Sequence, residues 1–203
     1  MASSKMGSRK IFRFITKESY EDFMSYILEC DIKSLFELKR DLEKNRLEFL
    51  QSIYNFDKEI KKLHNTLEKV GENWKGTIQK SIQNMQNAKK VSLKFYYDIT
   101  SKIDLLYEMF PIFKVDKEGD KSLFYNRFFS SRKERFIVHY MGSIYYFSDR
   151  ECTDLKGEIE LKESDKWNIT GCNVTITQPD RVWELSFDND GDASKFQEIC
   201  LYK

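Results

Sequence analysis

The sequence predicts an α+β protein in which a long helical hairpin or coiled coil precedes a seven-stranded β-sandwich or barrel capped by a C-terminal helix. Three observations carry this prediction. Apolar residues recur at intervals of three and four from Lys17 to Phe110. Beyond Pro111 they alternate with polar residues in short segments, and a final apolar stripe of helical spacing ends the chain. The first and last patterns are typical of amphipathic helices, and the middle one is typical of half-buried strands.

The helical region has an almost unbroken heptad spacing. Its apolar positions include Ile53, Phe56, Ile60, Leu63, Leu67, Val70, Trp74, Phe95, Ile99, Ile103, Leu106 and Phe110. Repetition over this length predicts a helical hairpin or a coiled coil between chains. Gly71 and Gly76 each weaken a helix by about 1 kcal/mol relative to Ala. A turn near them, and therefore a hairpin, is the favoured interpretation.

The change of period divides the chain. Residues 1–10 are interpreted as a tag or a disordered tail, residues 11–113 as the helical region, and residues 119–203 as the strand-rich domain. Pro111 ends the helical pattern, because the residue before a proline avoids the helical conformation. The segment 114–120 is charged and has no apolar run, so we expect the domain boundary there.

Seven short segments rich in β-branched and aromatic residues are predicted to be strands. They read SLFYNRFFS, ERFIVHY, SIYYFS, GEIEL, WNIT, NVTIT and VWELSF. The closing stretch DASKFQEICLYK has Ala193, Phe196, Ile199 and Cys200 on one helical face. Asp192 is its expected N-terminal cap.

Composition argues against several classes of protein. The net charge is +1: residues 1–115 carry 21 basic and 16 acidic residues (+5), and residues 116–203 carry 13 and 17 (−4). This balance does not suggest a nucleic-acid binder. No sequence motif for catalysis, a cofactor or a metal site is present, so we expect no enzyme, cofactor or metal. The cysteines are widely spaced and are expected to be free thiols of a cytoplasmic protein: Cys30, Cys152, Cys172 and Cys200.

Three segments in this order resemble a pleckstrin-homology domain. KERFIVHYMGSIYYFSD resembles the family's second and third strands, LKGEIELKES the following strand, and VWELSFDNDGDASKFQEI the last strand and closing helix. Phe196 stands where the family has a nearly invariant Trp, and it can still plug the barrel. The loop from Ser130 to Lys133 is shorter than in tight phosphoinositide binders.

The whole chain is also similar, more weakly, to the acylated pleckstrin-homology proteins of apicomplexan parasites. That similarity implies recognition of phosphatidic acid on the cytosolic face of a secretory-organelle membrane. The acylation motif of those proteins is not seen in this sequence.

The resemblance implies that basic residues near the end of the first strand and the start of the second grip lipid phosphate. The residues in that region are Lys121, Arg127, Arg132, Lys133 and Arg135. Lys133 and Arg135 share one face of a strand, and converging ammonium and guanidinium groups suit phosphate oxygens. Tyr145 or Tyr146 is expected to add a hydroxyl donor, and Phe129 to insert at the lipid boundary. The alternative is a solvated face that Glu134 and Asp120 partly neutralise.

The expected function is that of a peripheral membrane adaptor or sensor for an anionic lipid, either phosphatidic acid or a phosphoinositide. The alternative is a protein-interaction scaffold whose helices mediate self-association. Because a few cations bind a membrane weakly, a second anchor is expected. It is either a homodimer or other helical partner, or a basic helix face formed by Lys75, Lys80, Lys89, Lys90 and Lys94. The alternative is that this face is solvated, or that it pairs with Glu37, Asp41 and Glu48 on an antiparallel neighbour.

Overall fold

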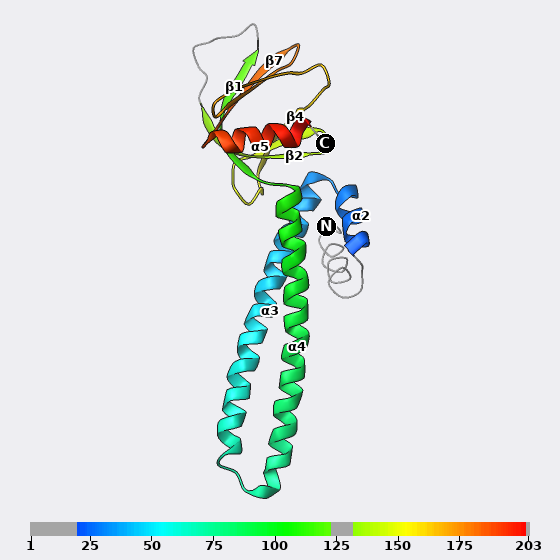
Figure 1. Cartoon of the computed structure of the whole chain (residues 1–203), viewed down its shortest axis with the longest axis vertical. Coiled ribbons are helices and arrows are strands. Elements are labelled where there is room, and N and C mark those ends of the chain that lie inside the picture. Colours follow the sequence, from blue (N-terminus) through cyan, green and yellow to red (C-terminus); the bar gives the residue numbers. More distant parts are fainter. Residues whose placement is uncertain (1–19, 123–131, 202–203) are drawn as a thin grey trace. The chain divides into compact units, whose positions relative to one another are not determined.

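The computed structural model describes residues 20–122 and 132–201. These residues form two units, divided between Leu106 and Tyr107. The helices are α2 (Tyr20–Glu29), α3 (Ile32–Leu67), α4 (Glu72–Met109) and α5 (Asp190–Leu201). The strands are β1 (Phe113–Ser122), β2 (Lys133–Tyr140), β3 (Ser143–Phe147), β4 (Leu155–Glu160), β5 (Lys166–Thr170), β6 (Asn173–Thr177) and β7 (Arg181–Phe187). The predicted order of long helices, strands and a final helix is confirmed (Figure 1).

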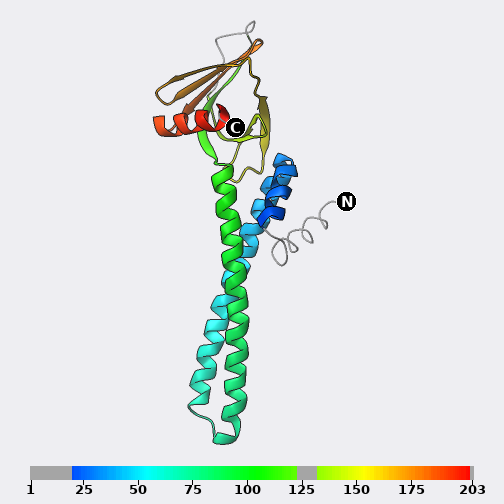
Figure 2. The ribbon, with the colours of Figure 1, turned by 45° about the vertical axis from the view of Figure 1, so that its right-hand side comes forward.

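The helices α3 and α4 form an antiparallel hairpin. They run side by side in both views (Figures 1 and 2). The rings of Phe49 and Phe95 lie 5.5 Å apart between centroids, and Asp57 forms an ion pair with Lys89, so residues later in α3 meet residues earlier in α4. The turn between them comprises residues 68–71 and includes Gly71, whereas Gly76 lies inside α4.

Local chemistry explains where α3 begins and how α2 packs in the same unit. The Asp31 side chain accepts a hydrogen bond of 2.7 Å from the backbone N–H of Ser34, which caps the helix. In α2, Phe23 is fully buried, and the Nζ of Lys102 lies 5.6 Å from its ring centroid. The long stem of a lysine can cover apolar surface in this way while its ammonium contacts the ring.

The seven strands form one antiparallel sheet in the order β4-β3-β2-β1-β7-β6-β5. Six of the predicted strands are confirmed, but the expected boundary at 114–120 is wrong, because this segment belongs to β1. In β1, Phe113, Val115 and Lys117 are buried, whereas Lys114 and Asp116 are exposed. In the sequence, the apolar–polar alternation of this strand is obscured because a lysine, Lys117, occupies an inward position. The expected first strand, SLFYNRFFS, lies almost wholly outside the described residues.

One hydrophobic core joins the inner face of the sheet to α5. Phe196 of α5 is fully buried, and its ring centroid lies 5.5 Å from that of Phe113 and 5.2 Å from that of Phe187. The core includes Ile159 of edge strand β4, and Trp167 of edge strand β5 packs against it, so the sheet curls around one cluster. The helix α5 begins two residues before the expected cap Asp192, whose N–H instead donates to the Asn189 side chain.

In the part of the chain that the structure describes, no helix combines the length and the apolar character needed to cross a bilayer.

Candidate functional site

Three neighbouring strands change from apolar to basic along the inner face of the sheet. Moving away from Phe196, this face carries Phe113, Val115 and Lys117 on β1; Ile137, Arg135 and Lys133 on β2; and Phe187, Leu185, Trp183 and Arg181 on β7. Val115 pairs with both Arg135 and Phe187, which fixes how the three strands align. Four residues of strand cover about 13 Å, so the change from Phe113 to Lys117 is abrupt. We call Lys117, Lys133, Arg135 and Arg181 the basic cluster.

Lys117 is held between two aromatic rings. Its Nζ lies 4.1 Å from the ring centroid of Tyr146 and 4.5 Å from that of Trp183, and the residue is only 9% exposed. The Cζ of Arg181 lies 4.7 Å from the same Trp183 ring. A cation over an aromatic face gains about 0.5–2 kcal/mol, most where water is excluded. The rings therefore stabilise two positive charges at one end of the sheet.

A glycine on the neighbouring strand makes room for this arrangement. Gly157 of β4 pairs with Tyr146 of β3. A Cβ placed on Gly157 would lie 2.2 Å from the Tyr146 hydroxyl oxygen and 2.5 Å from Cζ of its ring. Because no side chain fits in that space, only glycine lets Tyr146 cross β4 and contact Lys117.

Two members of the basic cluster with like charges lie directly opposite each other on neighbouring strands. Lys117 and Lys133 are direct register partners on β1 and β2, and like charges in that position destabilise a sheet. Lys133 is exposed, and among the described residues it forms no ion pair. An anion bound beside the two ammonium groups would replace repulsion with attraction.

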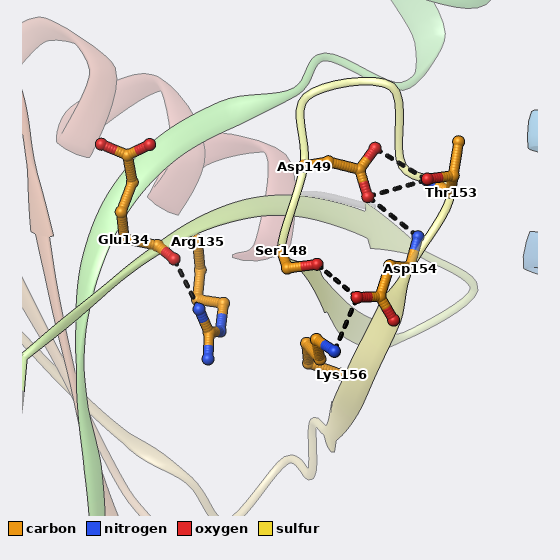
Figure 3. Close-up of polar contacts among 7 residues, drawn as sticks. All are labelled: Glu134, Arg135, Ser148, Asp149, Thr153, Asp154 and Lys156. Carbon is orange, nitrogen blue, oxygen red and sulfur yellow. Dashed lines mark hydrogen bonds and ion pairs between the residues drawn. The ribbon is translucent and has the colours of Figure 1, made fainter.

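Glu134 does not neutralise this cluster. It points to the opposite face of β2, where its carboxylate lies 3.0 Å from the Nζ of Lys114. Figure 3 shows the side chains of Glu134 and Arg135 extending in different directions. Arg135 is half-buried, and its Nη1 donates a 2.7 Å hydrogen bond to the Glu134 carbonyl oxygen. The expected neutralisation of the patch by Glu134 is therefore not the observed arrangement, and the side chain of Asp120, the other expected acid, is not among those described.

The loop between β3 and β4 borders Arg135 and is internally hydrogen-bonded (Figure 3). Asp149 accepts hydrogen bonds from the backbone N–H groups of Thr153 and Asp154, at 2.9–3.2 Å. The Ser148 hydroxyl donates to the Asp154 carboxylate at 2.6 Å, and Lys156 pairs with the same carboxylate. These contacts give the loop a defined shape beside the basic cluster.

The ion pair with Lys156 is the main cause that lowers the pKa of Asp154. The hydrogen bond from Ser148 and the charge of Arg135 lower this pKa further. Asp154 is consequently ionised at neutral pH and balances Lys156.

The structure brings together only part of the site that the sequence predicts. Lys133 and Arg135 lie on one face of β2, as expected, and Arg132 is exposed immediately before this strand. Lys121 lies in β1 and pairs with Val182, but its side chain is not among those described. The predicted positions Arg127 and Phe129 lie outside the described residues.

The strand register decides between Tyr145 and Tyr146. Tyr145 pairs with Val138, whereas Tyr146 pairs with Ile137, which shares its face of β2 with Arg135. Adjacent residues of a strand point to opposite faces, so Tyr146, and not Tyr145, lies on the face of Arg135. Tyr146 contacts Lys117 through its ring.

Two members of the basic cluster were missed. Lys117 lies within the segment expected to be the domain boundary, and Arg181 lies immediately before the expected strand VWELSF. The available signal was the alternation from Phe113 through Lys117, and the position of Arg181 two residues before the inward Trp183. Both signals depend on recognising β1, because β1 is the strand that brings β2 and β7 together.

The lysines of α4 are arranged differently. Lys75 pairs with Glu72 in its own helix, and Lys89 pairs with Asp57 of α3. Lys80, Lys90 and Lys94 are exposed. Among the described residues, the partner of these lysines across the hairpin is thus Asp57 and not the expected acids Glu37, Asp41 and Glu48.

The basic cluster has the chemistry of an anion site, because ammonium and guanidinium groups donate charge-assisted hydrogen bonds to phosphate or carboxylate oxygens. A guanidinium can also bind two oxygens of one phosphate at once. Comparison with known proteins found no family model that matches this chain and no curated protein that matches it.

Proposed function

We propose that this protein is a peripheral membrane adaptor or sensor that binds an anionic lipid, phosphatidic acid or a phosphoinositide, through the basic cluster of its sheet unit. It acts by recruitment to the cytosolic face of a membrane and not by catalysis. The observation that carries the proposal is the convergence of four cations from β1, β2 and β7 on one face of the sheet.

The architecture supports a pleckstrin-homology-like identity for the sheet unit. Seven antiparallel strands followed by one helix are what the sequence resemblance implies. Phe196 lies fully buried against the rings of Phe113 and Phe187, the plugging role expected at this position of the closing helix. These features support the family assignment, and the basic cluster at the other end of the core supports lipid phosphate as the ligand.

The two kinds of cation have different roles in the proposal. Lys117 and Arg181 lie against Trp183, which holds them in place before a ligand arrives. Lys133 is exposed, and Arg135 is half-buried at the same end of the face. We assign Lys133 and Arg135 to direct phosphate contact. A cation near an anionic surface contributes about 1 kcal/mol, so binding by the sheet unit alone should be weak.

Vesicle flotation of the full chain tests the proposal. Phosphatidylcholine vesicles containing phosphatidic acid, or a phosphoinositide, should carry the protein to the top of the gradient, whereas pure phosphatidylcholine should not. The double variant Lys133→Glu/Arg135→Glu should bind at least about 30-fold more weakly, because two contributions of about 1 kcal/mol each are lost. Raising the salt from about 0.1 M to about 1 M shortens the Debye length from about 10 Å to about 3 Å and should also weaken binding.

A matched control separates the cluster from net charge. Lys162→Glu/Lys166→Glu makes the same change of charge at two exposed lysines of the sheet unit that lie outside the cluster. This control should keep most of the binding. Equal losses in both double variants, or no flotation with any anionic vesicle, would reject the proposal.

A polypeptide ligand is the alternative, and one observation favours it. The strand β5 is an edge of the sheet, paired only with β6, and an extended peptide can add to such an edge. In that case the chain acts as a scaffold. Absence of flotation with every anionic vesicle is the result that this alternative predicts.

A further inference from the structure

A second heptad seam runs along α3, beside the face that packs on α4. Its positions are Glu43, Leu47, Leu50, Tyr54, Asp57 and Lys61, spaced alternately by four and three residues. This is the spacing of a coiled-coil interface. Its three large apolar side chains are exposed to solvent: Leu47 at 62%, Leu50 at 48% and Tyr54 at 64%. We call this set the outer seam.

The hairpin itself uses different positions of α3. Phe49 packs against Phe95 of α4, and Leu42 and Ile53 are buried. Leu50 follows Phe49 by one residue and is therefore turned about 100° around the helix. The outer seam is thus additional to the apolar face that closes the hairpin.

We propose that the outer seam joins two copies of this chain through an antiparallel, two-fold-symmetric pairing of their α3 helices. A two-fold interface brings one surface against itself. With the axis near Ser52, Leu50 of one copy lies opposite Tyr54 of the other, and Glu43 lies opposite Lys61. Each of these contacts occurs twice.

Charge complementarity favours a second copy of this chain as the partner and an antiparallel pairing of the two α3 helices. The seam is acidic at its start, at Glu43, and basic at its end, at Lys61. A parallel pair would place Glu43 against Glu43 and Lys61 against Lys61, whereas the antiparallel pair matches opposite charges. The acid in between, Asp57, is already paired with Lys89 of the same chain, so closing the seam leaves that charge balanced.

This interface does not depend on the lipid proposal, since it lies wholly on the hairpin. Sedimentation velocity of the full chain without lipid, over a range of concentrations, tests it. The wild-type chain should show a concentration-dependent dimer. Leu50→Lys should weaken the dimer about 100-fold, because the changed side chain occurs twice near the centre of the interface. Val91→Lys is the matched control: Val91 is 55% exposed on α4 and lies about 200° around that helix from Lys89.

Charge exchange tests the direction. Lys61→Glu should weaken the dimer about threefold to tenfold in an antiparallel pair, and adding Glu43→Lys should restore it. In a parallel pair, Lys61→Glu would leave like charges facing each other and change little. Tyr54→Lys is a second central variant, and helical circular dichroism shows whether each variant is folded.

Three results would overturn the proposal. These are a monomer at every concentration, a dimer that Leu50→Lys and Tyr54→Lys leave intact, and an equal loss with Val91→Lys. A dimer that Lys61→Glu does not weaken would overturn the antiparallel direction.

Discussion

The hairpin and the basic cluster place their lysines in different surroundings. In the hairpin, lysines form ion pairs with nearby acids: Lys62 with Glu59, Lys75 with Glu72, Lys89 with Asp57, and Lys102 with Asp98. In the basic cluster, Lys117 lies against two aromatic rings and is the register partner of Lys133. Lysines elsewhere in the sheet unit form ion pairs as in the hairpin, Lys114 with Glu134 and Lys156 with Asp154. Residues 116–203 nevertheless have the negative net charge, 13 basic against 17 acidic residues. Net charge by region is therefore a poor guide to where cations gather, because the arrangement on one face decides.

The largest expected effect distinguishes the cores of the two units. Phe196→Ala removes a fully buried ring and should lower the free energy of unfolding of the sheet unit by about 3–5 kcal/mol. Urea unfolding followed by tryptophan fluorescence measures this, because Trp167 and Trp183 belong to that unit.

Ile99→Ala is the corresponding change in the hairpin, where Ile99 is fully buried. It should lower the free energy of unfolding of the hairpin by about 2–5 kcal/mol. Unfolding followed by helical circular dichroism measures this change. If both variants shift the fluorescence and the circular dichroism transitions equally, the two units unfold as one. In that case a separate free energy of unfolding cannot be assigned to each unit.

A smaller effect on stability is expected from glycine-to-alanine substitutions, which we compare at Gly157 and Gly76. Gly157→Ala should destabilise the sheet unit by about 1–3 kcal/mol, because the Tyr146 ring must move away from the new Cβ. Gly76→Ala should instead stabilise the hairpin by about 0.5–1 kcal/mol, since Gly76 lies in a helix and no atom lies within 4 Å of its added Cβ. Chemical denaturation measures both, and the same sign at both sites would contradict the assigned roles.

The smallest effect concerns the start of α3. Asp31→Ala removes the cap to Ser34 and should cost about 1 kcal/mol at neutral pH. The hydrogen bond from Ser34 is the main cause that lowers the pKa of Asp31 in the folded chain below 3.8. A lowered folded pKa gives stability above the unfolded pKa that is lost as the pH falls through the folded value.

Urea unfolding at pH 7 and in strong acid checks this cap. The difference between Asp31→Ala and wild type should be present at pH 7 and disappear in acid. Asp104→Ala, a change at an exposed acid of α4, should show no such pH-dependent loss. A difference that persists in acid would show that the carboxylate is not the capping group.

Much of the candidate site could be predicted, and the failures have physical causes. Lys133 and Arg135 share a face because strand alternation is a local rule. The sequence leaves Tyr145 and Tyr146 as alternatives because the face of β3 depends on its register with β2. Lys117 was missed because its burial depends on Tyr146 and Trp183, which follow it by 29 and 66 residues.

The sequence by itself determined the order of helices and strands, the turn of the hairpin near Gly71 and the buried Phe196, since periodicity and turn residues act over a few positions. Only the tertiary structure decided that β1 begins at Phe113 and that cations from β1, β2 and β7 converge. The physical reason is that strand pairing joins residues far apart in the chain. Which charges meet is therefore set by register between strands and not by spacing along any one of them.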